Sequence, residues 1–245
     1  MRGTTLLELM IAMLLAALTA AGALATMAHV HRSWRAAEQT GRLHERALYV
    51  FGTLEPELQL AGYYGSAQTP ELVAAARAPD TCGNNTVTSL RPAVRVLRGN
   101  WSLPCAAQGS GHQAGSDVVI LHRASTRTAN TAGALLLRDK DTGAQHELVV
   151  RIFYVAQAAD GDVLTPALRV KSLTAIAGRP AFIDTEVMPG VTTMQVDLLP
   201  DAIHPRQVHV HLVVRTDAAD VAAGEQAPTL TMDRTFALRN HEEDS

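Results

Sequence analysis

The chain has 245 residues, of which 47% are apolar and 18% charged, a composition typical of a folded protein rather than a disordered or collagenous one. Its 24 acidic and 21 basic residues are spread without blocks and give a net charge of −3, which argues against direct nucleic-acid binding through a dedicated basic surface. Aromatic residues make up only 4%, so stacking platforms for bases or sugars are few.

A long apolar run lies near the N-terminus. Leu9 to Ala28 contain no charged side chain, and as a helix they would be about 30 Å long, the hydrocarbon thickness of a bilayer. The run therefore predicts a membrane-spanning helix. A secretory signal cleaved near Ala21-Gly22-Ala23 is the alternative, but Glu8 does not belong in such an apolar core. Arginines on both sides of the run leave its orientation open.

Apolar residues continue at helical spacings beyond this run, while most charged residues fall between them. The apolar stripe consists of Val30, Trp34, Ala37, Gly41, Leu48, Phe51, Leu54 and Leu58. The membrane helix, residues 4–28, is therefore expected to continue as an amphipathic helix over 29–62. Pro56 should kink it or start a new turn, and Gly62 and Gly65 should end it.

The remainder of the chain has the pattern of strands separated by turns. Strands are predicted at 117–121, 134–137, 147–156, 163–170, 191–199, 208–216 and 229–238. The expected fold class is α+β, in which the long helix packs on an antiparallel β-sheet domain over 117–241, followed by a tail at 242–245. Residues 66–115 are rich in Gly, Pro, Asn and Ala, so an irregular insertion is expected over 63–116.

Both cysteines, Cys82 and Cys105, lie in this insertion. In an oxidising periplasm they can pair and close a loop of about 24 residues, which contributes roughly 3 kcal/mol in the chain-entropy model. The sequence contains neither a CxxC motif nor a His/Cys cluster, so metal or redox chemistry is the weaker interpretation.

Three stretches were candidates for chemistry. His209 and His211 alternate on one strand and share a face, but no third metal ligand is evident. The Asp139–Gly143 stretch lacks the later acidic positions of a calcium loop and is better interpreted as a hairpin turn. Gly109–Gly115 lacks the spacing of a dinucleotide fingerprint and predicts a flexible loop. With no GxSxG, P-loop or HExxH motif, the sequence predicts no catalytic, cofactor or metal site and no enzyme.

At the start of the chain, the basic residue Arg2 and Gly3 precede Thr4-Thr5-Leu6-Leu7-Glu8-Leu9-Met10. This stretch resembles the class III signal of type IV prepilins and pseudopilins. The resemblance implies that prepilin peptidase cleaves after Gly3, that Thr4 becomes the N-methylated first residue, and that Glu8 is the acid at the fifth mature position. The family usually has Phe at the position that Thr4 occupies in this chain.

Physical chemistry gives Glu8 a role in subunit assembly. A carboxylate within a bilayer costs on the order of 2.5 to 3.5 kcal/mol on insertion scales, so a retained one normally has a partner or a function. Cleavage after Gly3 creates an α-amino group that, in a packed filament, can neutralise Glu8 of a neighbouring subunit. The alternative is that Glu8 lies at the cytoplasmic headgroup boundary and reaches out to water.

Further along the chain, a series of short motifs in order is similar to the PilW group of minor pilins, over residues 1 to about 241. The motifs are Leu60-Ala61-Gly62-Tyr63-Tyr64-Gly65, Cys82-Gly83-Asn84-Asn85, Gly115-Ser116-Asp117-Val118, Phe153-Tyr154-Val155-Ala156, Leu164-Thr165-Pro166-Ala167-Leu168-Arg169, Pro189-Gly190-Val191, Met194-Gln195-Val196 and Ala237-Leu238-Arg239-Asn240. Each motif is weak singly, and their order behind the prepilin-like signal makes the resemblance specific.

This resemblance implies a type IV pilin-like fold and a low-abundance pilin that helps to prime pilus assembly, in support of adhesion or twitching motility. The implied partners are prepilin peptidase, other minor pilins, the major pilin and a tip adhesin. The protein would cross the inner membrane once, with its C-terminal domain in the periplasm, and then join the pilus near its tip. A minor pseudopilin of a type II secretion system is the alternative, followed by a membrane-anchored periplasmic binding protein or enzyme.

Overall fold

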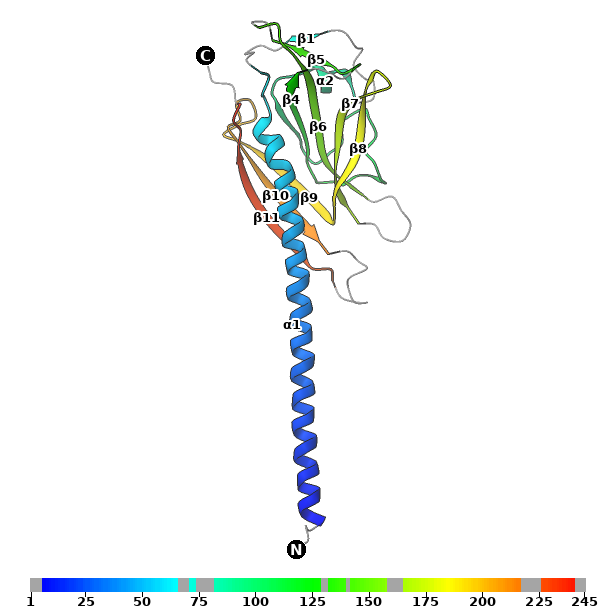
Figure 1. Cartoon of the computed structure of the whole chain (residues 1–245), viewed down its shortest axis with the longest axis vertical. Coiled ribbons are helices and arrows are strands. Elements are labelled where there is room, and N and C mark those ends of the chain that lie inside the picture. Colours follow the sequence, from blue (N-terminus) through cyan, green and yellow to red (C-terminus); the bar gives the residue numbers. More distant parts are fainter. Residues whose placement is uncertain are drawn as a thin grey trace. The chain divides into compact units, whose positions relative to one another are not determined.

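The computed structural model describes residues 6–65, 71–73, 82–128, 132–139, 142–157, 165–216 and 226–240. It is an α+β structure with one long N-terminal helix and antiparallel sheets (Figure 1). The chain divides into two compact units, Met1–Arg42 and Leu43–Ser245. The described part of the first unit is helical, and the second unit contains the C-terminal end of that helix together with both sheets.

Helix α1 (Leu6–Leu60) continues through Pro56, so the expected new turn at this proline does not form. The helix ends at Leu60, two residues before the predicted boundary, and Gly62 follows in a left-handed conformation with a φ of 78°. The backbone N–H of Gly62 donates to the carbonyl of His122 at 2.9 Å. The chain therefore leaves the helix by attaching at once to the sheet domain.

The buried stripe of α1 differs in part from the predicted one. Its buried residues are Leu43, Ala47, Val50, Phe51, Leu54 and Leu58. Of the predicted stripe only Phe51, Leu54 and Leu58 are buried, and its other five members are exposed: Val30, Trp34, Ala37, Gly41 and Leu48. At 100° per residue Leu48 points well away from the Leu43–Leu58 stripe, so the predicted stripe had joined two separate apolar faces of the helix.

The larger sheet has eight strands, β1 (Glu71–Val73), β2 (Val94–Leu97), β3 (Gly111–His112), β4 (Val118–Thr128), β5 (Leu136–Arg138), β6 (Gln145–Gln157), β7 (Ala167–Ile176) and β8 (Arg179–Pro189). Their main order is β1-β5-β6-β4-β2, with β3 and β7 also paired to β6 and with β8 paired to β7. All of these pairs are antiparallel. A short helix, α2 (Asn84–Thr88), precedes β2.

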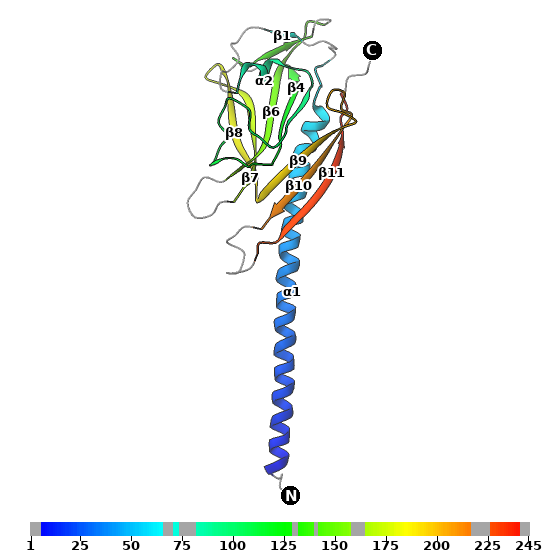
Figure 2. The same cartoon turned by 180° about the vertical axis from the view of Figure 1, so that it is seen from behind.

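The smaller sheet has three antiparallel strands in the order β11-β10-β9, and Figure 2 shows it from behind. These strands are β9 (Val191–Leu199), β10 (Gln207–Arg215) and β11 (Thr229–Ala237). The C-terminal end of α1 runs along this sheet in both views. Their apolar side chains belong to one core, in which the rings of Phe51 and Phe236 lie 6.0 Å apart.

Several predicted strands match the structure closely. The bounds of β9 are those predicted, and β10 and β11 begin and end within one residue of the expected positions. Strands β4 and β6 extend further than predicted, and β5 begins later. Strand β7 begins at Ala167 and runs to Ile176, while residues 163–164 of its predicted range lie outside the described residues.

One prediction of irregular structure was wrong, and one strand was missed. The supposed insertion 63–116 contributes β1, α2, β2 and β3, because β2 pairs with β4 and Gly111–His112 pairs with β6. Strand β8 was not predicted at all.

The predicted turn after β5 is present. The backbone N–H of Asp139 donates to the Ala144 carbonyl, and the Oδ1 atom of Asp139 accepts from the Thr142 N–H at 3.2 Å. Asp141 lies outside the described residues.

The central strands are buried on both faces, which explains why they form continuous apolar runs in the sequence. Alternate residues of β6 point to different cores: Phe153 and Val155 pack with α1 and the smaller sheet, whereas Ile152 and Tyr154 pack in a second core. The second core also contains Cys82, and Trp101 packs against it. The segment that carries the cysteines thus covers the face of the larger sheet opposite α1.

Candidate functional site

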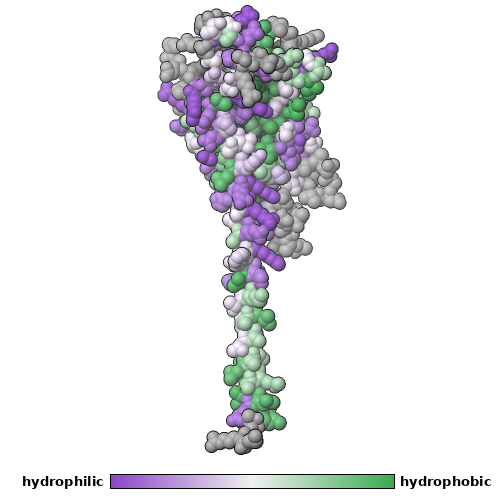
Figure 3. All heavy atoms as spheres, viewed as in Figure 1, coloured by the Kyte–Doolittle hydropathy of each residue, from purple (hydrophilic) through white to green (hydrophobic). Residues whose placement is uncertain are grey.

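The first candidate site is the N-terminal part of α1. Of the described helices, α1 is the one long and apolar enough to cross a membrane. Its large apolar side chains are exposed, from Leu6 at 78% to Met27 at 59%. Figure 3 shows apolar colouring along this part of the helix, followed by polar colouring further along. An exposed apolar surface of this extent is stable in a lipid or protein environment rather than in water.

The hydroxyl groups within the apolar run are satisfied by the helix itself. Thr19 Oγ1 donates to the Ala16 carbonyl at 2.9 Å, and Thr26 Oγ1 donates to the Gly22 carbonyl at 2.7 Å. Because a bilayer offers no water to polar groups, internal hydrogen bonds of this kind are what a membrane-spanning helix requires. The threonines therefore do not oppose insertion.

Glu8 lies in the first described turn of α1 and is exposed. A carboxylate near the N-terminal end of a helix interacts favourably with the positive end of the helix dipole. Arg32 is the next charged side chain after Glu8 along α1, at the far end of the apolar run. Gly3 and Thr4, the predicted processing residues, lie outside the described residues.

Residues Ser116 and Asp117, from one of the PilW-like motifs, connect the two sheets. Ser116 Oγ donates to the Met194 carbonyl and accepts from the Met194 N–H, at 3.1 and 3.0 Å. Asp117 Oδ2 accepts from the backbone N–H of Val196 at 2.9 Å, and its Oδ1 accepts from that of Gly99 at 2.9 Å. The two side chains therefore attach β9 to the start of β4.

Two further motif residues act at the ends of elements. Asn240 Nδ2 donates to the carbonyls of Gln59 and Ala61, at 3.2 and 3.4 Å, so it caps the C-terminal end of α1. Gly190 has a φ of 82°, and a Cβ there would lie 2.6 Å from the carbonyl oxygen of Arg215. A side chain at this position would be strained in conformation and would collide with the backbone, so glycine is required.

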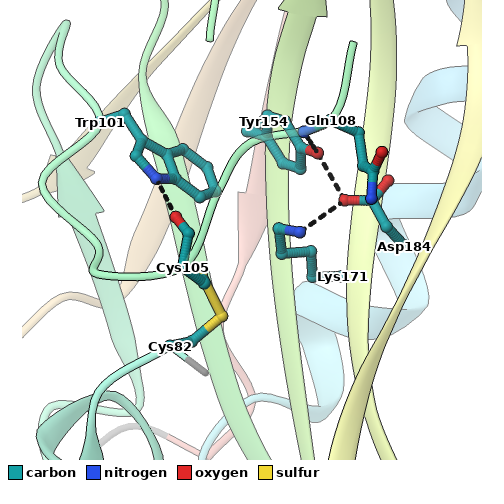
Figure 4. Close-up of a disulfide and its surroundings, with 7 residues drawn as sticks. All are labelled: Cys82, Trp101, Cys105, Gln108, Tyr154, Lys171 and Asp184. Atoms are coloured by element: carbon teal, nitrogen blue, oxygen red, sulfur yellow. Dashed lines mark hydrogen bonds and ion pairs between the residues drawn. A yellow bond between two sulfur atoms is a disulfide. The ribbon is translucent and has the colours of Figure 1, made fainter. Parts of the chain in front are cut away.

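The disulfide joins Cys82 to Cys105, with an S–S distance of 2.12 Å, and this is the pairing expected from the sequence. Trp101 Nε1 donates to the Cys105 carbonyl at 2.6 Å, and the indole packs on the ring of Tyr154 with centroids 4.8 Å apart (Figure 4). The backbone N–H of Gln108 donates to the Tyr154 hydroxyl at 3.0 Å. The segment 101–108 is thus fixed on the second core.

Beside the disulfide lies a buried ionic cluster centred on Asp184, which Figure 4 shows in part. Asp184 Oδ2 accepts from the Tyr154 hydroxyl at 2.5 Å and pairs with Lys171 Nζ at 2.9 Å. Asp184 Oδ1 accepts from Arg169 Nε at 2.6 Å. Burial raises the pKa of Tyr154 well above its ordinary value, and the hydrogen bond to Asp184 raises it further. The tyrosine therefore stays protonated and acts as a donor that links β6 to β8.

The histidine pair of β10 lies on the exposed face of the smaller sheet. His211 Nδ1 lies 2.7 Å and His209 Nε2 lies 3.5 Å from Asp233 Oδ1 on β11. His209 Nδ1 also lies 3.0 Å from Thr235 Oγ1. Among the residues that the structure describes, no group of three or more His, Cys, Asp or Glu side chains is arranged to hold a metal ion. Cross-strand hydrogen bonding is the role that this geometry supports.

The Asp184 cluster was missed by the sequence analysis because β8 was missed. The two residues between β7 and β8, Ala177 and Gly178, have φ values of 50° and 74°, as a type I′ hairpin turn requires. Glycine in the second position is typical of this turn, but alanine in the first is not. The hairpin was therefore hidden by an unusual turn residue.

The motif residues Ser116, Asp117, Gly190 and Asn240 thus lie at junctions of the fold, whereas the N-terminal part of α1 presents its side chains outward. No family model, curated protein or solved structure matches this chain.

Proposed function

We propose that the protein is a minor pilin of the PilW group that helps to prime assembly at the tip of a type IV pilus. In this proposal the fold is of the type IV pilin kind, and the protein has no enzymatic activity. Prepilin peptidase removes residues 1–3, and the mature chain then passes from the inner membrane into the filament. The sheet domain contacts other minor pilins, the major pilin or a tip adhesin.

One observation carries this proposal. A single helix, α1, begins with an exposed apolar run behind Glu8 and ends as a buried element of a sheet domain. A helix of this kind can lie in a bilayer while its folded domain is outside. It can equally pack by the same apolar surface against helices of other subunits, which is what transfer from a membrane to a filament requires.

Glu8 supplies the assembly step of the proposal. Its carboxylate stands next to Leu9, at the boundary of the uncharged run, where removal from water is costly unless a cation is near. The amino group that cleavage creates on Thr4 is such a cation. In an assembled filament, the amino group of one subunit would neutralise Glu8 of its neighbour, and this attraction is strong in an apolar core.

The first test is the N-terminal sequence and intact mass of the protein isolated from its native membranes, with and without prepilin peptidase. We expect residues 1–3 to be lost only when the peptidase is present, which leaves Thr4 first. A chain that begins at Met1 in both strains would contradict the proposal and indicate a plain anchor. A chain that begins near Ala23 or Ala25 would indicate an exported protein instead.

The second test replaces Glu8 by alanine. The variant should insert in the membrane at the wild-type level, because the apolar run is unchanged, but its amount in sheared pili should fall roughly tenfold or more. The measurement is the ratio of pilus-bound to membrane-bound protein by immunoblot. Glu45→Ala is the matched control, since Glu45 is an exposed acid on the same helix outside the run. Equal incorporation of both variants would exclude the proposed role of Glu8.

A further inference from the structure

The segment that directly follows the apolar run has a distinct composition. We call His29–Arg35 the collar; it contains two histidines, two arginines and a tryptophan. All seven residues are helical and exposed. From Leu9 to Ala37 the chain contains no acidic side chain, so the collar is a cationic segment within a stretch that has no negative charge.

The collar has two different faces. His29, Arg32 and Arg35 follow one another at intervals of three residues, which places them on neighbouring positions along one side of the helix. Val30 and Trp34 are four residues apart and lie on another side. Met27, 59% exposed, precedes Val30 by three residues and continues this apolar side into the run. The collar is therefore amphipathic, whereas the run before it is apolar on all sides.

The position of the collar matches the polar layer of a bilayer. At 1.5 Å per residue, the Cα atoms of Arg32 and Trp34 lie about 6 and 9 Å beyond that of Ala28 along the axis of the helix, and because helical side chains are directed back toward the N-terminus, their ends lie closer to Ala28 than these distances. The headgroup layer extends roughly 5 to 8 Å beyond the hydrocarbon on each side. Arg32 Nε donates to the Ala28 carbonyl at 3.3 Å, so this side chain is directed back toward the end of the run.

We propose that the collar binds the phosphate groups of anionic phospholipids in the leaflet where the apolar run ends. Arg32 and Arg35 pair with the phosphates, because a guanidinium matches phosphate oxygens in charge and geometry. Trp34 lies in the interfacial layer, where the amphipathic indole ring is most stable. The inference rests on the proposed function, since it requires the run to cross a membrane.

This contact would fix the depth of the subunit before assembly. Withdrawal of the helix from the bilayer must separate the two arginines from their phosphates, so the collar resists extraction until subunit contacts replace the lipid. The collar is thus a lipid-binding surface of the membrane-inserted subunit.

The test uses the full-length chain with Trp101→Phe, which leaves Trp34 as the sole tryptophan of the two. The protein is reconstituted in vesicles of phosphatidylcholine and phosphatidylglycerol in equal amounts. Two vesicle preparations are compared: in one the phosphatidylcholine, and in the other the phosphatidylglycerol, is brominated near the headgroup end of its acyl chains. Quenching of Trp34 fluorescence is measured in each. We expect brominated phosphatidylglycerol to quench more strongly, in line with a roughly tenfold preference for this lipid at the collar.

The preference should disappear in Arg32→Gln/Arg35→Gln, with both brominated lipids quenching equally. It should persist in the control Arg179→Gln/Arg206→Gln, which removes two exposed arginines of the sheet domain. An intact disulfide, verified by mass, controls for folding of each variant. Equal quenching by the two lipids in the starting protein would overturn the lipid preference but leave the membrane span in place. Absence of quenching by either brominated lipid would show that Trp34 does not lie at the bilayer, which contradicts the membrane span and the proposed function with it.

Discussion

Replacement of Asp117 by alanine is expected to lower the free energy of unfolding by about 3 to 5 kcal/mol. The Asp117 carboxylate is 4% exposed and accepts the backbone N–H groups of Gly99 and Val196. It also pairs with Arg98 Nη1 at 3.2 Å. Without this carboxylate, the N–H groups of Gly99 and Val196 and one side of the Arg98 guanidinium lose their acceptor. A buried donor without an acceptor lowers the free energy of unfolding. The measurement is urea unfolding of the full chain in detergent, followed by Trp101 fluorescence.

Two further variants make this prediction specific. Asp117→Asn should destabilise the protein less than Asp117→Ala does. The amide oxygen of asparagine can accept from one of the two backbone N–H groups, whereas its NH2 group is itself a donor and cannot accept from the other. Asp197→Ala should have little effect, since Asp197 binds Arg98 Nη2 at 2.8 Å but its side chain is 56% exposed. If Asp117→Ala proved no more destabilising than Asp197→Ala, the junction between the sheets would not depend on this carboxylate.

A loss of stability as the pH falls from about 6.5 to about 4 is expected from His122, which is completely buried on β4. Burial lowers the pKa of His122 from 6.5 to about 4, and the nearby charge of Arg95 also lowers it. Its Nε2 lies 2.6 Å from the Thr86 carbonyl oxygen, so the neutral ring donates its proton there. Between these pH values the unfolded chain binds a proton that the folded chain excludes, so stability falls by roughly 3 kcal/mol across this window.

The variant His122→Gln isolates this effect. Glutamine retains an N–H donor for the Thr86 carbonyl but does not titrate, while the other nine of the ten histidines are the same in both proteins. The difference in unfolding free energy between wild type and variant should therefore shift by roughly 3 kcal/mol in favour of the variant from pH 7 to pH 4. A difference that is constant with pH would mean that His122 has an ordinary pKa in the folded protein.

These two side chains show why parts of the fold could not be predicted. His122 continues the apolar run of β4, and neither its burial nor its partner on α2 can be inferred from neighbouring residues. The carbonyl that it binds belongs to Thr86, in the segment interpreted as irregular. Asp117 likewise is the first residue of a predicted strand, but its acceptor role depends on β9, some eighty residues along the chain. Contacts at such separations are decided by topology and not by local pattern.

The elements that were predicted well carry their pattern within themselves. The apolar run of α1 is as long as a bilayer is thick, and its composition alone implies the environment that it needs. Strands β9, β10 and β11 alternate apolar and polar side chains because one face packs on α1 and the other is exposed. For these segments, periodicity and length were sufficient.

The sequence by itself therefore determined the long N-terminal helix, the strands β9, β10 and β11, the most central strands of the larger sheet and the possibility of a disulfide between the two cysteines. Only the tertiary structure decided which stripe of α1 is buried, that β2 and β8 are strands, and that Tyr154, Lys171 and Arg169 converge on Asp184. The physical reason is that apolar periodicity reports burial along one element. Ion pairs, strand partners and sheet junctions arise from register between elements that are distant in the chain.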